Sequence, residues 1–127
     1  MKNRPAPSHQ SSFLLPDLSS QLDERHQLCR LARRLDWRQF EEAFGALYSE
    51  EDRPALPIRR MVGLLILKQL MNLSDEGVVE FWTLSGYAQF FCGETQLQWG
   101  APCEASELVH FRHRIGPQGA ERILQAR

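Results

Sequence analysis

The 127-residue sequence lacks a long hydrophobic run, and its cysteines lack paired spacing. Its longest apolar stretch, residues 61–67, ends at Lys68 and is far shorter than the roughly 20 residues of a membrane helix. Cys29, Cys92 and Cys103 include no C-x-x-C pair, which argues against a disulfide framework. The first residues also lack the apolar core of a signal peptide. We therefore expect a cytoplasmic protein with no membrane contact.

The sequence also lacks an excess of charge of either sign. It has 15 Lys and Arg against 16 Asp and Glu, a formal net charge of −1. This balance argues against a protein that coats nucleic acid or membranes over its whole length, but it allows a local basic face. Glycine-rich phosphate loops and nucleophile motifs are missing too, so no motif indicates an enzyme class.

Strand-like alternation of apolar and polar residues is missing, and helical spacing takes its place. Residues 1–17 are rich in Pro, Ser and Asn and are expected to form a flexible lead. Residues 18–127 are expected to form a single domain. We therefore predict an all-α fold, a small helical bundle with a helix-turn-helix-like C-terminal part.

Apolar spacing and capping residues predict two helices near the start of the domain. Asp36 is placed to cap the second helix, with Gln39 at the capping-box position and Leu35 and Phe40 as its hydrophobic staple. The buried stripe of the first helix is predicted to be Leu28, Leu31, Ala32 and Leu35. The buried side of the second is predicted to continue through Phe40, Phe44 and Leu47.

Residues 58–73 are apolar almost all round, which is typical of a central helix wrapped by others. The segment before them contains Pro54 and Pro57 and is expected to be a connection. The acidic side chains on the preceding helix and in this connection are interpreted as solvated surface: Glu41, Glu42, Glu50, Glu51 and Asp52.

Ser74 is predicted to cap the next helix, because Asp75 and Glu76 in its first turn complement the helix dipole. Gly86 is expected to end that helix. A short turn or helix over residues 87–93 and a loop over residues 94–105 then lead to the last helical region.

The stretch SELVHFRHRIG, residues 106–116, is unusually cationic for a nearly neutral chain. At about 100° per residue, its buried stripe is formed by Leu108, Phe111 and Ile115. The opposite side carries Ser106, His110, His113 and Arg114. Such an outward row can contact DNA bases and phosphates, and a plain solvated face is the alternative. Gly116 and Pro117 are expected to break the helix.

Arg112 lies at the edge of this apolar stripe and is expected to serve the fold. We predict an ion pair with a carboxylate of a neighbouring helix, and a secondary DNA contact is the alternative. The candidate partners are Asp75, Glu76 and Glu80.

Two further groups of residues have simpler interpretations than a binding site. Cys92, Cys103, His110 and His113 depart from the spacing of structural zinc sites, so no metal site is predicted. Cys92 is instead interpreted as a small buried hydrophobic residue. The three tryptophans are expected in the core or at its edge: Trp37, Trp82 and Trp99.

From about His26 onward, the chain resembles the N-terminal domain of bacterial insertion-sequence transposases of the insertion-sequence-five-like family. The resemblance lies in five motifs in the same order: HQLCRLARRLDW, LYSEEDRPALP, LPIRRMVGLLILKQLMNLSDEGVVEFW, YAQFFCGE and PCEASELVHFRHRIG. The last matches the family pattern at Ser106, Leu108, Phe111, Arg112, Arg114, Ile115 and Gly116. Glu104 stands where the family typically has Asp, and Gly77 where a helix former is usual.

The resemblance implies a helical domain that helps to bind the terminal inverted repeats of the element. It also implies an RNase H-like catalytic domain with a DDE triad and divalent metal, in a part of the family's proteins that lies beyond residue 127. We therefore expect this chain to be truncated, to be no enzyme alone and to hold no cofactor. The origin could be a fragment, a truncated reading frame or one of two overlapping frames.

The sequence thus favours a DNA-binding domain of a transposase, with double-stranded DNA as its partner. Two alternatives remain open. The first is a helical interaction or dimerisation module that assembles the transposase, by self-association or with a separate catalytic chain, without touching DNA. The second is a decayed transposase remnant. The near-neutral net charge slightly favours the interaction module over a DNA-binding domain.

Overall fold

The computed structural model describes residues 17–48 and 56–126, which form a small all-α bundle. The described part contains no strand, and the predicted fold class is confirmed. Its elements are the 3-10 helix η1 (Leu18–Gln21) and the α-helices α2 (Gln27–Arg34), α3 (Trp37–Gly45), α4 (Ile58–Met71), α5 (Asp75–Leu84), α6 (Gly86–Phe91) and α7 (Ala105–Ala126). The predicted lead, except Asp17, and the acids of residues 50–52 lie outside the described residues.

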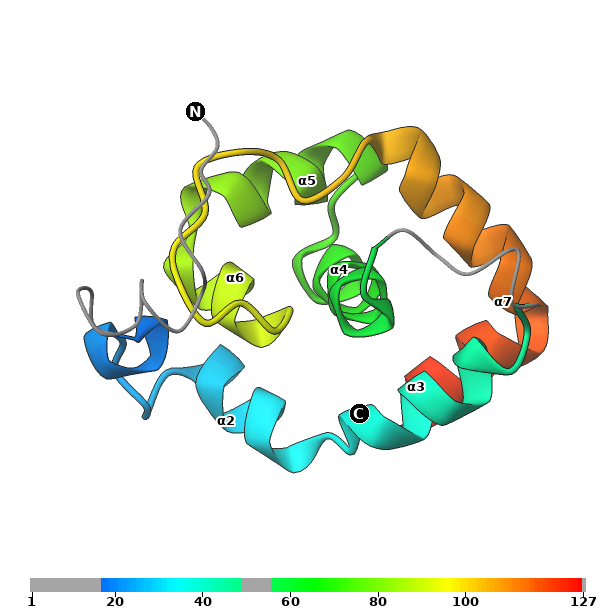
Figure 1. Cartoon of the computed structure of the whole chain (residues 1–127), viewed down its shortest axis with the longest axis horizontal. Helices are drawn as coiled ribbons and strands as arrows, with labels where there is room; N and C mark the ends of the chain where they lie inside the picture. The colour runs from blue at the N-terminus through cyan, green and yellow to red at the C-terminus, as the bar shows by residue number, and fades with distance from the viewer. Residues whose placement is uncertain (1–16, 49–55, 127) are drawn as a thin grey trace.

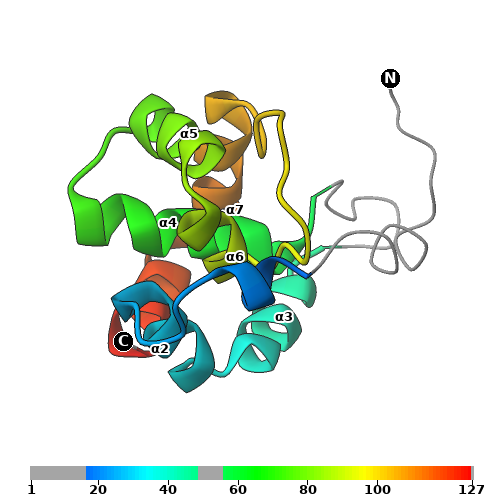
Figure 2. The same ribbon diagram turned by 90° about the vertical axis from the view of Figure 1, so that its left-hand side faces the viewer.

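Helix α4 forms the centre of the bundle, as its nearly uniform apolar sequence predicts. Figure 1 shows it end-on, with the other helices arranged around it, and Figure 2 shows it from the side. Val62, Leu64, Ile66 and Leu67 are fully buried. Only the end of the helix emerges, because Leu70 and Met71 are 43% and 41% exposed. None of the described helices has the length and apolar character needed to cross a membrane.

Helices α2 and α3 bury the predicted stripes up to the end of α3, except that Leu31 is only partly buried against the core. Leu28, Ala32 and Leu35 are buried, and the Asp36 carboxylate accepts a hydrogen bond from the Gln39 amide at 3.4 Å. The prediction for Leu47 is wrong, because its side chain is 44% exposed. The helix ends at Gly45, so the helical spacing that placed Leu47 on the buried side no longer applies.

Serine caps determine the start of α5 and the junction between α5 and α6. The Ser74 hydroxyl accepts a hydrogen bond from the Gly77 amide at 2.9 Å, as predicted. The prediction that Gly86 ends α5 is wrong. Ser85 ends the helix in an extended conformation, and its hydroxyl accepts from the Ala88 amide at 3.1 Å. Gly86 therefore becomes the first residue of α6.

Two polar side chains hold the loop between α6 and α7 against the bundle. The buried side-chain amide of Gln89 donates to the backbone carbonyl oxygens of Trp82 and Gln98 at 3.2 and 3.0 Å. Its side-chain oxygen accepts from the backbone N–H of Gln98 at 2.7 Å. Arg60 donates to the Glu94 carboxylate at 2.7 Å and to the Pro102 carbonyl at 3.0 Å. The loop is therefore fixed although it has no regular structure.

Trp99 lies on this loop and is 86% exposed, so the prediction that it belongs to the core or its edge is wrong. The other two tryptophans behave as predicted, because Trp82 is buried and Trp37 is half-buried against the core. The difference arises because this part of the loop contacts the bundle through the backbone of Gln98, while the Trp99 side chain extends into solvent.

Helix α7 consists of two segments that meet at a sharp break. Gly116 has φ of 67°, in the left-handed region that favours glycine, and Pro117 follows it. Gly119 allows the close approach at this corner, since a Cβ there would lie 2.5 Å from Cβ of Ile115. The predicted break is confirmed. α7 packs against α4 and α5, although α6 and the loop make its connection to α5 longer than a compact helix-turn-helix turn.

We predict that Gln89→Ala lowers the free energy of unfolding by about 2–4 kcal/mol, because it leaves polar groups of the loop and α5 without partners. Gln98→Ala is the matched control, because its exposed side chain donates to the Gln96 carbonyl and its backbone contacts remain. Urea unfolding followed by circular dichroism measures both. Equal losses for the two variants would contradict the role assigned to Gln89.

Candidate nucleic-acid interface

The first segment of α7, residues 105–115, presents the predicted outward row on a well-anchored helix. Its buried stripe is confirmed, since Leu108, Phe111 and Ile115 are 0%, 4% and 5% exposed. Phe111 contacts Phe44 of α3 edge to face, with ring centroids 6.1 Å apart. On the opposite side the structure places four exposed residues: Ser106, His110, His113 and Arg114.

The start of this segment also carries negative charge, which the spacing of the cationic residues does not reveal. The Glu107 carboxylate accepts a hydrogen bond from the Glu104 amide at 2.7 Å, half of a capping box. Glu104, a departure from the family pattern, still occupies the position before the first helical residue. Because Glu104 and Glu107 are both exposed, the outward surface of α7 has mixed charge.

Arg114 is exposed, but its guanidinium also contacts the end of α3. Nη1 donates to the Leu47 carbonyl at 3.4 Å, and Cζ lies 4.7 Å from the centre of the Tyr48 ring. Burial raises the pKa of the Tyr48 hydroxyl, and the charge of Arg114 acts in the opposite direction. The Tyr48 contact restricts the guanidinium to one region of the surface, next to His110, with which it lines a cavity of about 200 Å³.

Arg112 pairs with Asp75, the first of its predicted partners. Nη1 and Nη2 donate to the two carboxylate oxygens at 2.9 and 3.2 Å, a bidentate arrangement. The hydrogen bonds from Arg112 hold the pKa of Asp75 below its usual range, and the same bonds raise the pKa of Arg112. The ion pair joins the first turn of α5 to the middle of the first segment of α7.

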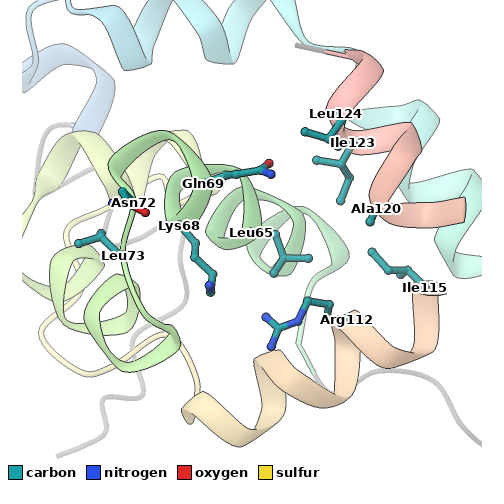
Figure 3. A pocket seen from close by; sticks show the side chains of 10 residues that line it. All are labelled: Leu65, Lys68, Gln69, Asn72, Leu73, Arg112, Ile115, Ala120, Ile123 and Leu124. Atoms are coloured by element: carbon teal, nitrogen blue, oxygen red, sulfur yellow. The ribbon is translucent and has the colours of Figure 1, made fainter. Parts of the chain in front are cut away.

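A cavity of about 270 Å³ lies behind this ion pair, between the C-terminal half of α4 and both segments of α7. Figure 3 shows Leu65, Ile115 and Ile123 lining it, with Lys68 and Arg112 on the side of α5. Lys68 is close enough to Asp75 to contribute to its lowered pKa. The cavity therefore has a mixed lining, and its two cationic residues, Lys68 and Arg112, both lie near the carboxylate of Asp75.

The four residues weighed as zinc ligands divide into two buried thiols and two exposed imidazoles. Cys92 packs against Gly63 of α4, where a Cβ would lie 2.7 Å from its sulfur, and the prediction that Cys92 is buried is confirmed. Burial raises the pKa of Cys92, and it raises that of Cys103 to about 11. In the described part of the chain, no three His, Cys, Asp or Glu side chains form a group suited to a metal ion.

Comparison with known proteins places the chain among transposase-related sequences. The family described as transposase domain (DUF772) matches residues 16–114. A curated protein of Rhizobium meliloti, described as uncharacterized protein ORF8 in nfe locus, is 46% identical over 121 residues, which cover 94% of this chain. The chain spans 58% of that relative's length. No solved structure matches.

We predict that Arg112→Ala lowers the free energy of unfolding by roughly 1–2 kcal/mol, since the pair is partly exposed and joins two helices. Arg122→Ala is the control, because it removes one positive charge from an exposed position on the same helix. It should lower the free energy of unfolding by less than about 0.5 kcal/mol.

The difference in the free energy of unfolding between the parent and Arg112→Ala should become smaller as the pH falls. Asp75 has a lowered pKa in the folded state, so its contribution is present above the unfolded value of about 4 and is lost as the pH falls through the lower folded value. Urea unfolding at neutral pH and at successively lower pH measures this. A difference that grows on acidification would contradict the assignment.

Proposed function

The chain belongs to the transposase domain family (DUF772), and from this membership we propose that it binds the double-stranded DNA of terminal inverted repeats. The proposed contact surface is the outward row of α7: Ser106, His110, His113 and Arg114. The single observation that carries the proposal is the arrangement of α7. Its apolar stripe is buried in the core, and this row is exposed on the other side.

The chemistry of the row suits a duplex. An arginine can donate in bidentate fashion to a guanine edge or to a phosphate, and serine and histidine can donate to either. Asp75 holds Arg112 within the fold, so we assign Arg112 to positioning and not to base reading. In this arrangement α5 supports α7 through the ion pair, as the first helix of a helix-turn-helix unit supports the second.

We further propose that the chain derives from an insertion-sequence-five-like element whose transposase is of the DDE class. The support is the order of five motifs from His26 to the end of the chain, and their match to the family pattern around Phe111 and Arg114. Sequencing the DNA on both sides of the region that encodes residues 1–127 tests the origin. The expected result is a reading frame for an RNase H-like domain followed by a terminal repeat.

We predict that Arg114→Ala weakens binding to a duplex carrying the terminal repeat by roughly 1–3 kcal/mol, and reduces the preference for it over a scrambled duplex if Arg114 contacts a base edge. His110→Ala and His113→Ala should weaken binding less than Arg114→Ala, because an imidazole cannot donate in bidentate fashion as a guanidinium does. Fluorescence anisotropy at two salt concentrations measures these effects.

Arg122→Ala is the control for the lost charge, and thermal unfolding checks that Arg114→Ala remains folded despite losing its contact with Leu47. Parent-like binding of both duplexes by Arg114→Ala under every condition would reject the outward row as the DNA surface.

An interaction module without DNA contact is the second candidate, and two observations favour it. Glu104 and Glu107 place negative charge beside the row on α7. Trp99 and Leu84 are 86% and 79% exposed, and large exposed apolar side chains are typical of protein interfaces. A steep salt dependence of duplex binding supports the first candidate. Concentration-dependent self-association without duplex binding supports the second.

A further inference from the structure

Helix α2 carries the densest run of positive charge in the described part of the chain. Residues 26–35 contain three arginines and no acidic residue. The helix buries Leu28 and Ala32, and its polar surface carries Arg30, Arg33 and Arg34, all exposed. The His26 imidazole caps its first turn by accepting from the Leu28 amide at 3.0 Å. The arginines are thus attached to a helix fixed at its start and on its buried side.

Arg30 and Arg34 differ from the neighbouring arginines, whose guanidinium groups have partners within the protein. Arg25 pairs with Asp23 at 3.1 Å and Arg38 with Glu42 at 3.7 Å. Arg33 donates to the Glu24 carbonyl at 3.3 Å. Within the described residues, the guanidinium groups of Arg30 and Arg34 make neither a hydrogen bond nor an ion pair.

Arg30 and Arg34 also share a concave surface. They lie one helical turn apart, and with Gln27 they form the polar wall of a groove of about 430 Å³ between α2 and the end of α4. The apolar edge of the groove is formed by Leu70 and Met71, which are partly exposed. Figure 1 shows α2 and the first segment of α7 (orange) on different sides of α4, so this groove is separate from the outward row of α7.

We infer that Arg30 and Arg34 bind the phosphate backbone of duplex DNA at this groove, a second contact surface that rests on the proposed function. A guanidinium has only hydrogen-bond donors, and their planar arrangement matches two oxygens of one phosphate. Two such groups without carboxylate partners therefore favour a ligand with several negative charges, such as a phosphate backbone. Gln27 adds an amide donor to the same wall. Contacts of this kind fix the position of a duplex and read no sequence.

The test compares Arg30→Ala/Arg34→Ala with Arg25→Ala/Arg38→Ala in the full chain. Both double variants lose two exposed positive charges, so they change the net charge equally. They differ in that Arg25 and Arg38 already have carboxylate partners. Two duplexes of unrelated sequence serve as probes, their dissociation constants are measured over a salt series, and circular dichroism melting shows that each variant is folded.

Arg30→Ala/Arg34→Ala should weaken binding to both duplexes equally, by roughly 10- to 100-fold at about 0.1 M salt. It should also reduce the slope of log affinity against log salt by about 1.8, because each lost phosphate contact contributes about 0.9. Arg25→Ala/Arg38→Ala should change the affinity by less than about threefold and leave the slope nearly unchanged.

Equal losses of duplex affinity in the two double variants would overturn the inference, because the change in net charge alone would explain them. Unchanged affinity in Arg30→Ala/Arg34→Ala would overturn it too. In both cases sequence-selective binding that depends on Arg114 would leave the proposed function standing. A parent chain that binds neither the two probe duplexes nor the terminal repeat would reject the inference and the proposed function together.

Discussion

The rest of the structure depends on the need to surround α4 with apolar side chains. Four side chains of α4 are fully buried within two turns, so the surrounding helices contribute apolar side chains to the same core. Each of those helices then has an opposite face that the core does not need. The polar surfaces of α2 and α7 are two such faces, and they could therefore take on a binding role without loss of packing.

Some arginines join elements of the fold near this core, and others lie on the surface. Arg60 and Arg112 reach carboxylates and carbonyls of other elements, and their charges are compensated within the molecule. Arg30 and Arg34 remain exposed on α2, and Arg114 is exposed on the first segment of α7, on a different side of α4, where it also donates to the Leu47 carbonyl. A chain with a net charge of −1 can therefore present local positive surfaces, which are the surfaces that a transposase domain needs if it is to bind DNA.

Features that depend on neighbours in sequence could be predicted, and features that depend on distant contacts could not. The cap at Ser74 and the exposure of the α7 row follow from local spacing. The position of Arg112 at the edge of a buried stripe also followed from local spacing, but that spacing left three carboxylates as candidate partners, and only the structure selects Asp75. Leu47 was misplaced because spacing does not show where a helix ends. Trp99 was misplaced because its loop is positioned by Gln89, a contact across nine residues that no local pattern reveals.

The central claim is that the outward faces of this helical domain bind duplex DNA while the core and the Arg112–Asp75 pair hold them in place. Backbone amide chemical shifts of the isotope-labelled chain, recorded during titration with a terminal-repeat duplex, test it most directly. The account predicts shifts concentrated at residues 106, 110, 113 and 114 of α7 and along α2, with the buried residues of α4 unaffected. Shifts confined to the loop around Trp99, or no shifts at saturating duplex, would contradict it.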